Sequence, residues 1–243
     1  NGERYEGIQN EDALSWLDEL GLRIETIGSI RNGRQVFASA SLDREVVLDP
    51  TGVADVIKTY LVANTSHDGS LAISGMITPT RVVCANTQAI ALGNYKQRFT
   101  IRHTESALSR IADARDGMLK LHGWMDAFEV EAQALIQTEI TKAQFDEIVS
   151  RAFPMPEKDA KGSMKKWETK VDLVQELYTA PTNVMIAGTA WGAYQTLTEH
   201  LDYYSNPRKG NTENILVKAS GMDDNHNAKK NNLLTIVKSV AMA

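Results

Sequence analysis

The sequence predicts an α+β fold, with an antiparallel sheet in the first part of the chain and helices in the second. Asn32-Gly33 lies between two runs of alternating apolar and polar residues, which is the strongest short-range signal for a β-hairpin. From Thr104 onward, apolar residues recur at helical spacing instead. Strands grouped before helices indicate an α+β fold rather than alternating βαβ units.

Residues 1–103 are expected to form a β-rich core. Residues 10–20 predict a short amphipathic helix, with Asn10 as its N-cap and Gly21 at its end. The hairpin follows, and Asp49-Pro50-Thr51-Gly52 predicts a second turn. We expect further strands from Val56, over 71–78 and from Gln97, because these runs alternate or are rich in β-branched and aromatic residues.

One central helix is expected within this core. Pro79-Thr80 precedes "RVVCANTQAIALG", and Thr80 is the predicted N-cap of a helix that ends at Gly93. Cys84 falls in the body of that helix. A catalytic cysteine needs a lowered pKa and a nearby base, which His67 or His103 could supply. Our interpretation is a small buried side chain, because catalytic cysteines favour helix N-termini.

Residues 104–243 are expected to form a helical region that packs on the core within one composite domain. Thr141 and Gln144 predict a capping box at the start of one helix. "FPMPEKDAKGS" is the predicted linker, and further helices are expected at 164–178, 189–204 and 229–241. Aromatic residues at helical spacing in "GTAWGAYQTLTEHLDYY" indicate core packing.

Composition narrows the function classes. The 243-residue chain has 42% hydrophobic residues and one cysteine, which excludes an internal disulfide and is consistent with a reducing cytoplasm. The sequence contains no run of eighteen apolar residues, so it predicts no membrane-spanning helix. The net charge of −5 is not the basic charge typical of a nucleic-acid-binding protein. Affinity for phosphate nevertheless depends on where the cationic side chains lie, so the net charge does not exclude a local basic groove. No Walker loop and no GxGxxG motif is present, so we expect no nucleotide cofactor.

A metal site is the less favoured interpretation of the histidine and acidic residues. His67, Asp68 and His103 could be combined with Glu199, His200 and Asp202 into a hypothetical metal-nuclease site. No HExxH or paired CxxC spacing supports it, and we therefore predict no metal or other cofactor. Asp68-Gly69 is also ordinary turn chemistry. We assign a structural polar network at the strand-to-helix junction to four residues: His67, Asp68, Asn86 and His103.

The basic residues favour a nucleic-acid interface more strongly than the histidine and acidic residues favour a metal site. Arg31 and Arg34 flank the hairpin tip, and a strand from Gln97 would present Lys96, Arg98 and Arg102 in a row on one face. Tyr95 and Phe99 lie between these cations, a pattern that suits single-stranded nucleic acid, whose phosphates meet cations and whose bases stack on rings. The alternative is a solvated strand face that pairs with nearby acids.

Several segments together resemble the phage/plasmid-like protein family, a domain-of-unknown-function family of phages and plasmids and their bacterial hosts. They are "YEGIQNEDALSWLDEL", "RNGRQVFASASL", "VANTSHDGS", "TPTRVVCANT", "IRHT" and "GTAWGAYQTLTEHLDY". The resemblance covers nearly the whole chain and implies a mobile-element origin and a bacterial cytoplasm. The hairpin, strands and helix also look like the core of phage single-strand annealing proteins, which form rings or filaments and pair complementary strands without ATP.

Our leading hypothesis is a phage or plasmid protein that binds and anneals single-stranded DNA, acting as a homo-oligomer without catalysis and away from membranes. The expected DNA-binding residues are Arg31, Arg34, Arg81, Lys96, Arg98, Arg102, Tyr95 and Phe99. One rival is a metal-dependent nuclease that uses His67, Asp68 and His103. A second rival is a host-interaction or anti-defence protein whose acidic surface meets a host protein.

Overall fold

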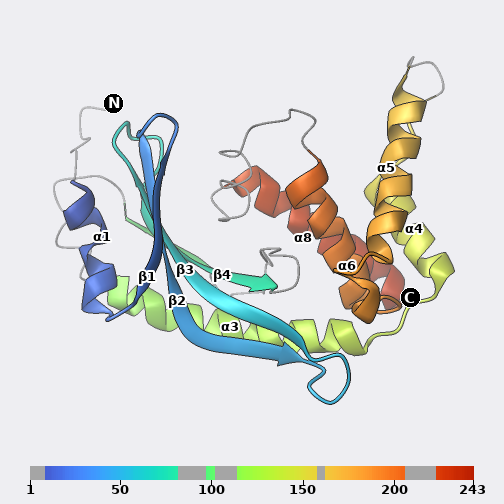
Figure 1. Ribbon diagram of the computed structural model, residues 1–243, viewed down its shortest axis with the longest axis horizontal. Helices are drawn as coiled ribbons and strands as arrows, with labels where there is room; N and C mark the ends of the chain where they lie inside the picture. The colour runs from blue at the N-terminus through green and yellow to red at the C-terminus, as the bar shows by residue number, and fades with distance from the viewer. Residues whose placement is uncertain (1–8, 82–96, 102–113, 158–161, 206–222) are drawn as a thin grey trace. The chain divides into compact units, whose positions relative to one another are not determined.

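A computed structural model describes residues 9–81, 97–101, 114–157, 162–205 and 223–243, and it confirms the α+β class (Figure 1). The chain divides into two compact units. The sheet unit comprises Asn1–Val46, Ile57–Thr80 and Ala91–Phe128. The helical unit comprises Val47–Val56, Arg81–Ile90 and Glu129–Ala243. The sequence pattern changes near residue 104, but the boundary between the two units lies later, at Phe128. The first part of the long helix Ala114–Gln137 therefore belongs to the sheet unit.

Among the described elements, the strands come first in the sequence and most of the helices follow them. Strands and one short helix come first: α1 (Asn10–Glu19), β1 (Ile24–Ile30), β2 (Gln35–Leu48), β3 (Asp55–Ser66), β4 (Ile73–Arg81) and β5 (Arg98–Ile101). Helices follow: α3 (Ala114–Gln137), α4 (Lys142–Ala152), α5 (Ser163–Tyr178), η1 (Val184–Ile186), α6 (Ala190–Glu199), η2 (His200–Tyr204) and α8 (Asp224–Ala241). Of these, η2 is a π-helix that continues α6.

The five strands form one antiparallel sheet in the order β1-β2-β3-β4-β5. The predicted hairpin around Asn32-Gly33 is confirmed, since β1 pairs with β2 from Ile30 opposite Gln35. The predicted turn at Asp49 is also confirmed, because the Asp49 carbonyl accepts a hydrogen bond from Gly52 N at 3.1 Å. Each connection between neighbouring strands β1 to β4 is therefore short, as expected for a meander.

Helix α1 packs on the face of the sheet to which Phe99 of β5 points. The predicted apolar side of α1 is confirmed, with Ala13, Trp16 and Leu17 buried. The Trp16 ring meets Phe99 edge-on, with 5.2 Å between the ring centroids. The prediction of an Asn10 N-cap is wrong: Gln9 is the N-cap residue and makes no side-chain capping bond, because the helix already includes Asn10.

Helix α3 supplies further apolar side chains within the sheet unit. Leu121, Trp124, Met125 and Phe128 are buried, and the Trp124 and Phe128 rings stack at 5.4 Å. Thr59 Oγ1 of β3 donates to Met125 Sδ at 4.0 Å. These contacts place the α3 side chains on the sheet.

The predicted start of the central helix is wrong. Thr80 and Arg81 belong to β4, which runs through Pro79 instead of ending before it. Pairing with β5 covers Ile73 to Met76, and Pro79 lies beyond it, where a residue without an N–H costs no bond to β5. The remainder of the predicted helix, including Cys84, lies outside the described residues.

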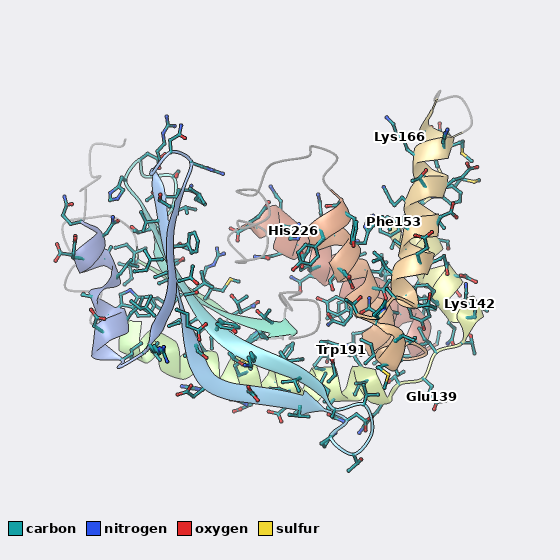
Figure 2. All side chains as sticks on the ribbon, in the orientation of Figure 1. Glu139, Lys142, Phe153, Lys166, Trp191 and His226 are labelled. Atoms are coloured by element: carbon teal, nitrogen blue, oxygen red, sulfur yellow. The ribbon has the colours of Figure 1, made fainter. Side chains whose placement is uncertain are left out.

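The helical unit begins its bundle with the predicted capping box. Thr141 Oγ1 accepts from Gln144 N at 3.2 Å, and Gln144 Oε1 accepts from Thr141 N at 2.9 Å. The predicted helices at 164–178, 189–204 and 229–241 are confirmed as α5, as α6 with η2, and as α8. Every residue of α6 is buried, and Trp191 Nε1 donates to Asp55 Oδ2 at 2.9 Å (Figure 2).

Gly75→Ala is expected to destabilise the protein by about 1–3 kcal/mol, because it overpacks the junction of α1, β4 and β5. A Cβ at Gly75 would lie 2.7 Å from Phe99 Cζ and 2.8 Å from a Trp16 ring carbon. Urea unfolding measures this loss. The same Gly75→Ala change should cost less in a Phe99→Leu background, and an equal cost in both backgrounds would contradict the proposed clash.

Candidate nucleic-acid interface

The turn between β1 and β2 carries two exposed arginines. Arg31, Asn32 and Gly33 all have left-handed backbone conformations, with φ of 54°, 57° and 79°. This region suits glycine and costs an ordinary L-residue about 1–2 kcal/mol. Arg31 and Arg34 are exposed, and Arg34 N donates to the Arg31 carbonyl at 3.3 Å. A strained non-glycine residue in an exposed turn is an observation from which a functional role can be inferred.

The turn between β3 and β4 lies directly beside the first turn. His67 N donates to the Arg34 carbonyl at 2.8 Å, and Gln35 Nε2 donates to Ser70 Oγ at 2.9 Å. The His67 side chain is exposed. Two arginines and a histidine are therefore presented together at one end of the sheet. We call Arg31, Arg34 and His67 the basic turn cluster.

Asp68 belongs to the same turn and is the acidic neighbour of this cluster. Its Oδ1 accepts from Ser70 N at 2.9 Å. Hydrogen bonds from Ser70 lower the pKa of Asp68, and the charge of Arg34 lowers it further. Gly69 follows with φ of 72°, as the predicted turn requires. His67 and Asp68 thus brace a turn between two strands, and neither lies at a junction between a strand and a helix.

The basic and aromatic residues of β5 point to opposite faces of the sheet. Arg98 pairs with Met76 and Phe99 with Gly75, so the predicted alternation is confirmed. The Phe99 ring packs on Trp16. Arg98 is half-buried, and its Nη2 donates to Met76 Sδ at 3.7 Å, on the face where Ser74 Oγ donates to Asn64 Oδ1 at 2.7 Å. Phe99 is therefore a packing residue.

Other predicted site residues are placed in part or not at all. Arg81 is the last residue of β4, and its side chain is not described. Six residues from the earlier predictions lie outside the described part of the chain: Cys84, Asn86, Tyr95, Lys96, Arg102 and His103. Among the described residues, no group of three or more histidine, cysteine, aspartate or glutamate side chains could hold a metal ion.

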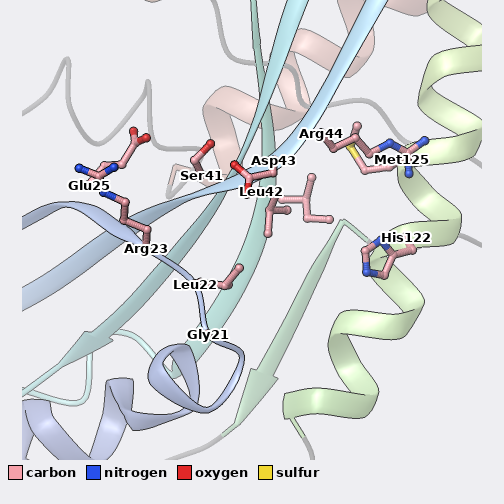
Figure 3. Close-up of a pocket in the computed structure, with 11 residues that line it drawn as sticks. Gly21, Leu22, Arg23, Glu25, Ser41, Leu42, Asp43, Arg44, His122 and Met125 are labelled. Atoms are coloured by element: carbon pink, nitrogen blue, oxygen red, sulfur yellow. The ribbon is translucent and has the colours of Figure 1, made fainter.

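A pocket of about 550 Å³ with a mixed polar and apolar lining lies elsewhere in the sheet unit (Figure 3). Ile77 and Met125 are its buried apolar residues. Charged groups of both signs line it, among them Arg23 and Asp43. Arg44 also lines it and is held by Asp126, with Nη2 2.7 Å from Oδ1. The mixed charges give the pocket no preference for an anionic ligand, so it is a weaker nucleic-acid candidate than the basic turn cluster.

Sequence reasoning missed a charged cluster inside the helical unit. Asp202 of η2 is buried, and its Oδ1 lies 2.5 Å from His226 Nε2 (Figure 2). Lys230 Nζ donates to Asp202 Oδ2 at 2.9 Å, and the lysine has no exposed surface. Burial raises the pKa of Tyr194, and the charge of Asp202 adds to this effect. The available sequence signal was His226 and Lys230, four residues apart on one helical face.

Two further polar groups are buried beside this cluster. Glu199 Oε2 accepts from Asn183 Nδ2 at 2.7 Å and from Thr182 Oγ1 at 3.0 Å. The His200 ring meets Phe153 edge-on at 5.2 Å, and its Nδ1 has no hydrogen-bond partner among the described residues. Glu199, His200 and Asp202 point to separate partners, so they do not converge on one metal position. Their contacts stabilise the helix bundle.

The chain belongs to a protein family whose members share a domain of unknown function. The family, described as "Domain of unknown function (DUF932)", matches residues 1–231. Comparison with curated proteins and with solved structures found no match. Within the described residues, no helix combines the length and the apolar character that crossing a membrane requires.

Lys230→Met is expected to lower the free energy of unfolding by about 3–5 kcal/mol, because removing one partner leaves the Asp202 charge buried without its ammonium. Urea unfolding measures the change. Lys229→Met is the matched control, since the neighbouring side chain is exposed and its loss should cost less than about 0.5 kcal/mol. Equal stabilities for the two variants would contradict this role of Lys230.

Stability should fall at acid pH through His200. Burial lowers the pKa of His200 to about 4, and the Lys170 charge contributes, whereas an unfolded histidine titrates near 6.5. The unfolded chain therefore binds the proton first, and stability is lost as pH falls from about 6.5 toward 4, by about 2 kcal/mol at pH 5. Unfolding at pH 7.5 and pH 5 should show a smaller loss for His200→Phe. Replacing the exposed His122 by Asn should leave the full loss.

Proposed function

We propose that this chain is a phage- or plasmid-derived protein that binds and anneals single-stranded DNA through the basic turn cluster, without ATP and as a homo-oligomer. The carrying observation is that Arg31, Arg34 and His67 are exposed at one end of the sheet, on turns joined by a 2.8 Å backbone hydrogen bond. The proposed mobile-element origin and bacterial cytoplasm rest on the family resemblance of the sequence alone.

The geometry favours phosphate contacts over base reading. Guanidinium groups bind phosphate oxygens through paired donors, and the fixed backbone of the turn limits the ordering cost of presenting them. Backbone contacts of this kind carry no sequence information. Because Phe99 packs against Trp16, we assign it no base-stacking role. The proposed binding is therefore electrostatic and indifferent to base identity.

Arg98 contributes less in this proposal than the turn arginines do. Its guanidinium lies against the Met76 sulfur and the side chain is half-buried. A contact with phosphate would have to compete with that packing. Arg98 therefore extends the cationic surface of the sheet without defining it, and the turn arginines are the residues on which the proposal depends.

Arg31→Ala combined with Arg34→Ala should weaken binding to a labelled single-stranded oligonucleotide and flatten its salt dependence. Each lost phosphate contact removes about 0.7 from the slope of log K against log salt, so the double variant should lose about 1.4. Fluorescence anisotropy at two or more salt concentrations measures both quantities.

Lys165→Ala with Lys166→Ala is the matched control, since it removes the same charge from exposed positions of α5. The control should bind as the native chain does. No binding at low salt, or equal weakening by both double variants, would overturn the proposed site. Magnesium-dependent cleavage of the oligonucleotide would instead support the nuclease alternative.

A further inference from the structure

We infer that β1 is the edge through which the chain pairs with a second copy of itself, in an antiparallel arrangement with Ile27 of the two copies directly opposite each other. β1 is the terminal strand of the five-stranded sheet. One side of its backbone pairs with β2, and on the other side none of the described strands pairs with its N–H and C=O groups.

Several side chains of β1 are exposed to solvent, although the strand contains three isoleucines. Thr26, Ile27 and Ser29 are exposed, and 64% of Ile27 is accessible. By contrast, Ile30 on the other face is buried. An exposed large aliphatic residue at the middle of an edge strand offers a new strand both backbone groups and apolar surface.

Natural sheets usually protect an open edge with charge, proline or a bulge. Thr26 to Ile30 carries no charged residue and no proline. A register shift marks a bulge at Glu25, at one end of the strand. The unprotected stretch is therefore Thr26–Ile30, and the bulge at Glu25 marks one end of it.

The strand is complementary to itself about Ile27, which favours a second copy over an unrelated segment. In this register, Ile27 faces Ile27 of the other copy, and Thr26 faces Gly28. Glu25 lies at the bulge, beyond this pairing, so the only charge of the strand meets no like charge at its centre. A two-fold axis through Ile27 thus buries the exposed apolar side chain against its own equivalent.

This pairing deepens the proposed function, because it would repeat the basic turn cluster along a shared sheet. Arg31 lies four residues from Ile27, so the two Arg31 positions would be about 27 Å apart at about 3.4 Å per residue. The pairing itself needs no DNA. Self-association and oligonucleotide binding can therefore fail separately.

Cysteine cross-linking of the full-length chain tests the register. In a Cys84→Ala background, Ile27→Cys should form a disulfide-linked dimer under mild oxidation, because opposed Cα atoms lie about 4.5–5.5 Å apart, within disulfide reach. Ser29→Cys alone should remain monomeric on a non-reducing gel, since its two copies would lie about 14 Å apart.

Sedimentation measures the uncross-linked association. Ile27→Lys should weaken the dimer at least tenfold, whereas Val130→Lys, at a 72% exposed position of α3, should not. A chain that stays monomeric at all concentrations would overturn the inference. Cross-linking of Ile27→Cys to Ser29→Cys in place of itself, or equal effects of the two lysine variants, would do so as well.

Discussion

The alternation of side chains across the sheet is the constraint on which the sheet unit depends. In β5, Phe99 turns toward Gly75 and Trp16, and Arg98 turns to the opposite face beside Met76. Because successive residues of a strand must point to opposite faces, an aromatic residue that fills the core places its neighbour away from it. A one-residue slip would bury the arginine and expose the ring, so the register is strongly specified.

The helical unit depends on a different constraint, the neutralisation of buried charge. Asp202 is enclosed together with His226 and Lys230, and a carboxylate in such surroundings is tolerated only with close partners. Such a cluster adds little net stability over an apolar core, but breaking it is costly. Its physical effect is to tie α8 to the π-helical end of α6, since Asp202 lies on η2 and its partners His226 and Lys230 lie on α8.

Local sequence patterns predicted the elements better than their limits. Asn32-Gly33 identified a hairpin and Thr141 with Gln144 identified a helix start, because both signals act through nearby backbone groups. Thr80 after Pro79 looked like a helix start for the same local reason, yet β4 continues through both. Whether a proline ends a strand depends on which neighbour that position pairs with, and pairing across the sheet is not written in local spacing.

The candidate site shows the same division. Arg31 and Arg34 could be placed at a hairpin tip from sequence, but their neighbour His67 could not, since it is brought there by pairing between strands that are distant in sequence. The Asp202 cluster was missed because η2 and α8 are separate segments whose packing is tertiary. Helical spacing of His226 and Lys230 shows that they share a face, but it does not show what that face meets.

An acidic chain can bind a polyanion if only nearby charges count. At physiological ionic strength, charges beyond about 8 Å are largely screened, so the net charge of −5 says little about the end of the sheet. At the two turns, the charge of Asp68 acts on the neighbouring Arg34 and offsets part of the positive charge there. One protomer would hold a strand weakly, and useful affinity then requires several copies on one strand. A weak site on each copy thus requires self-association for useful affinity, and the proposed pairing through the edge strand β1 would supply it.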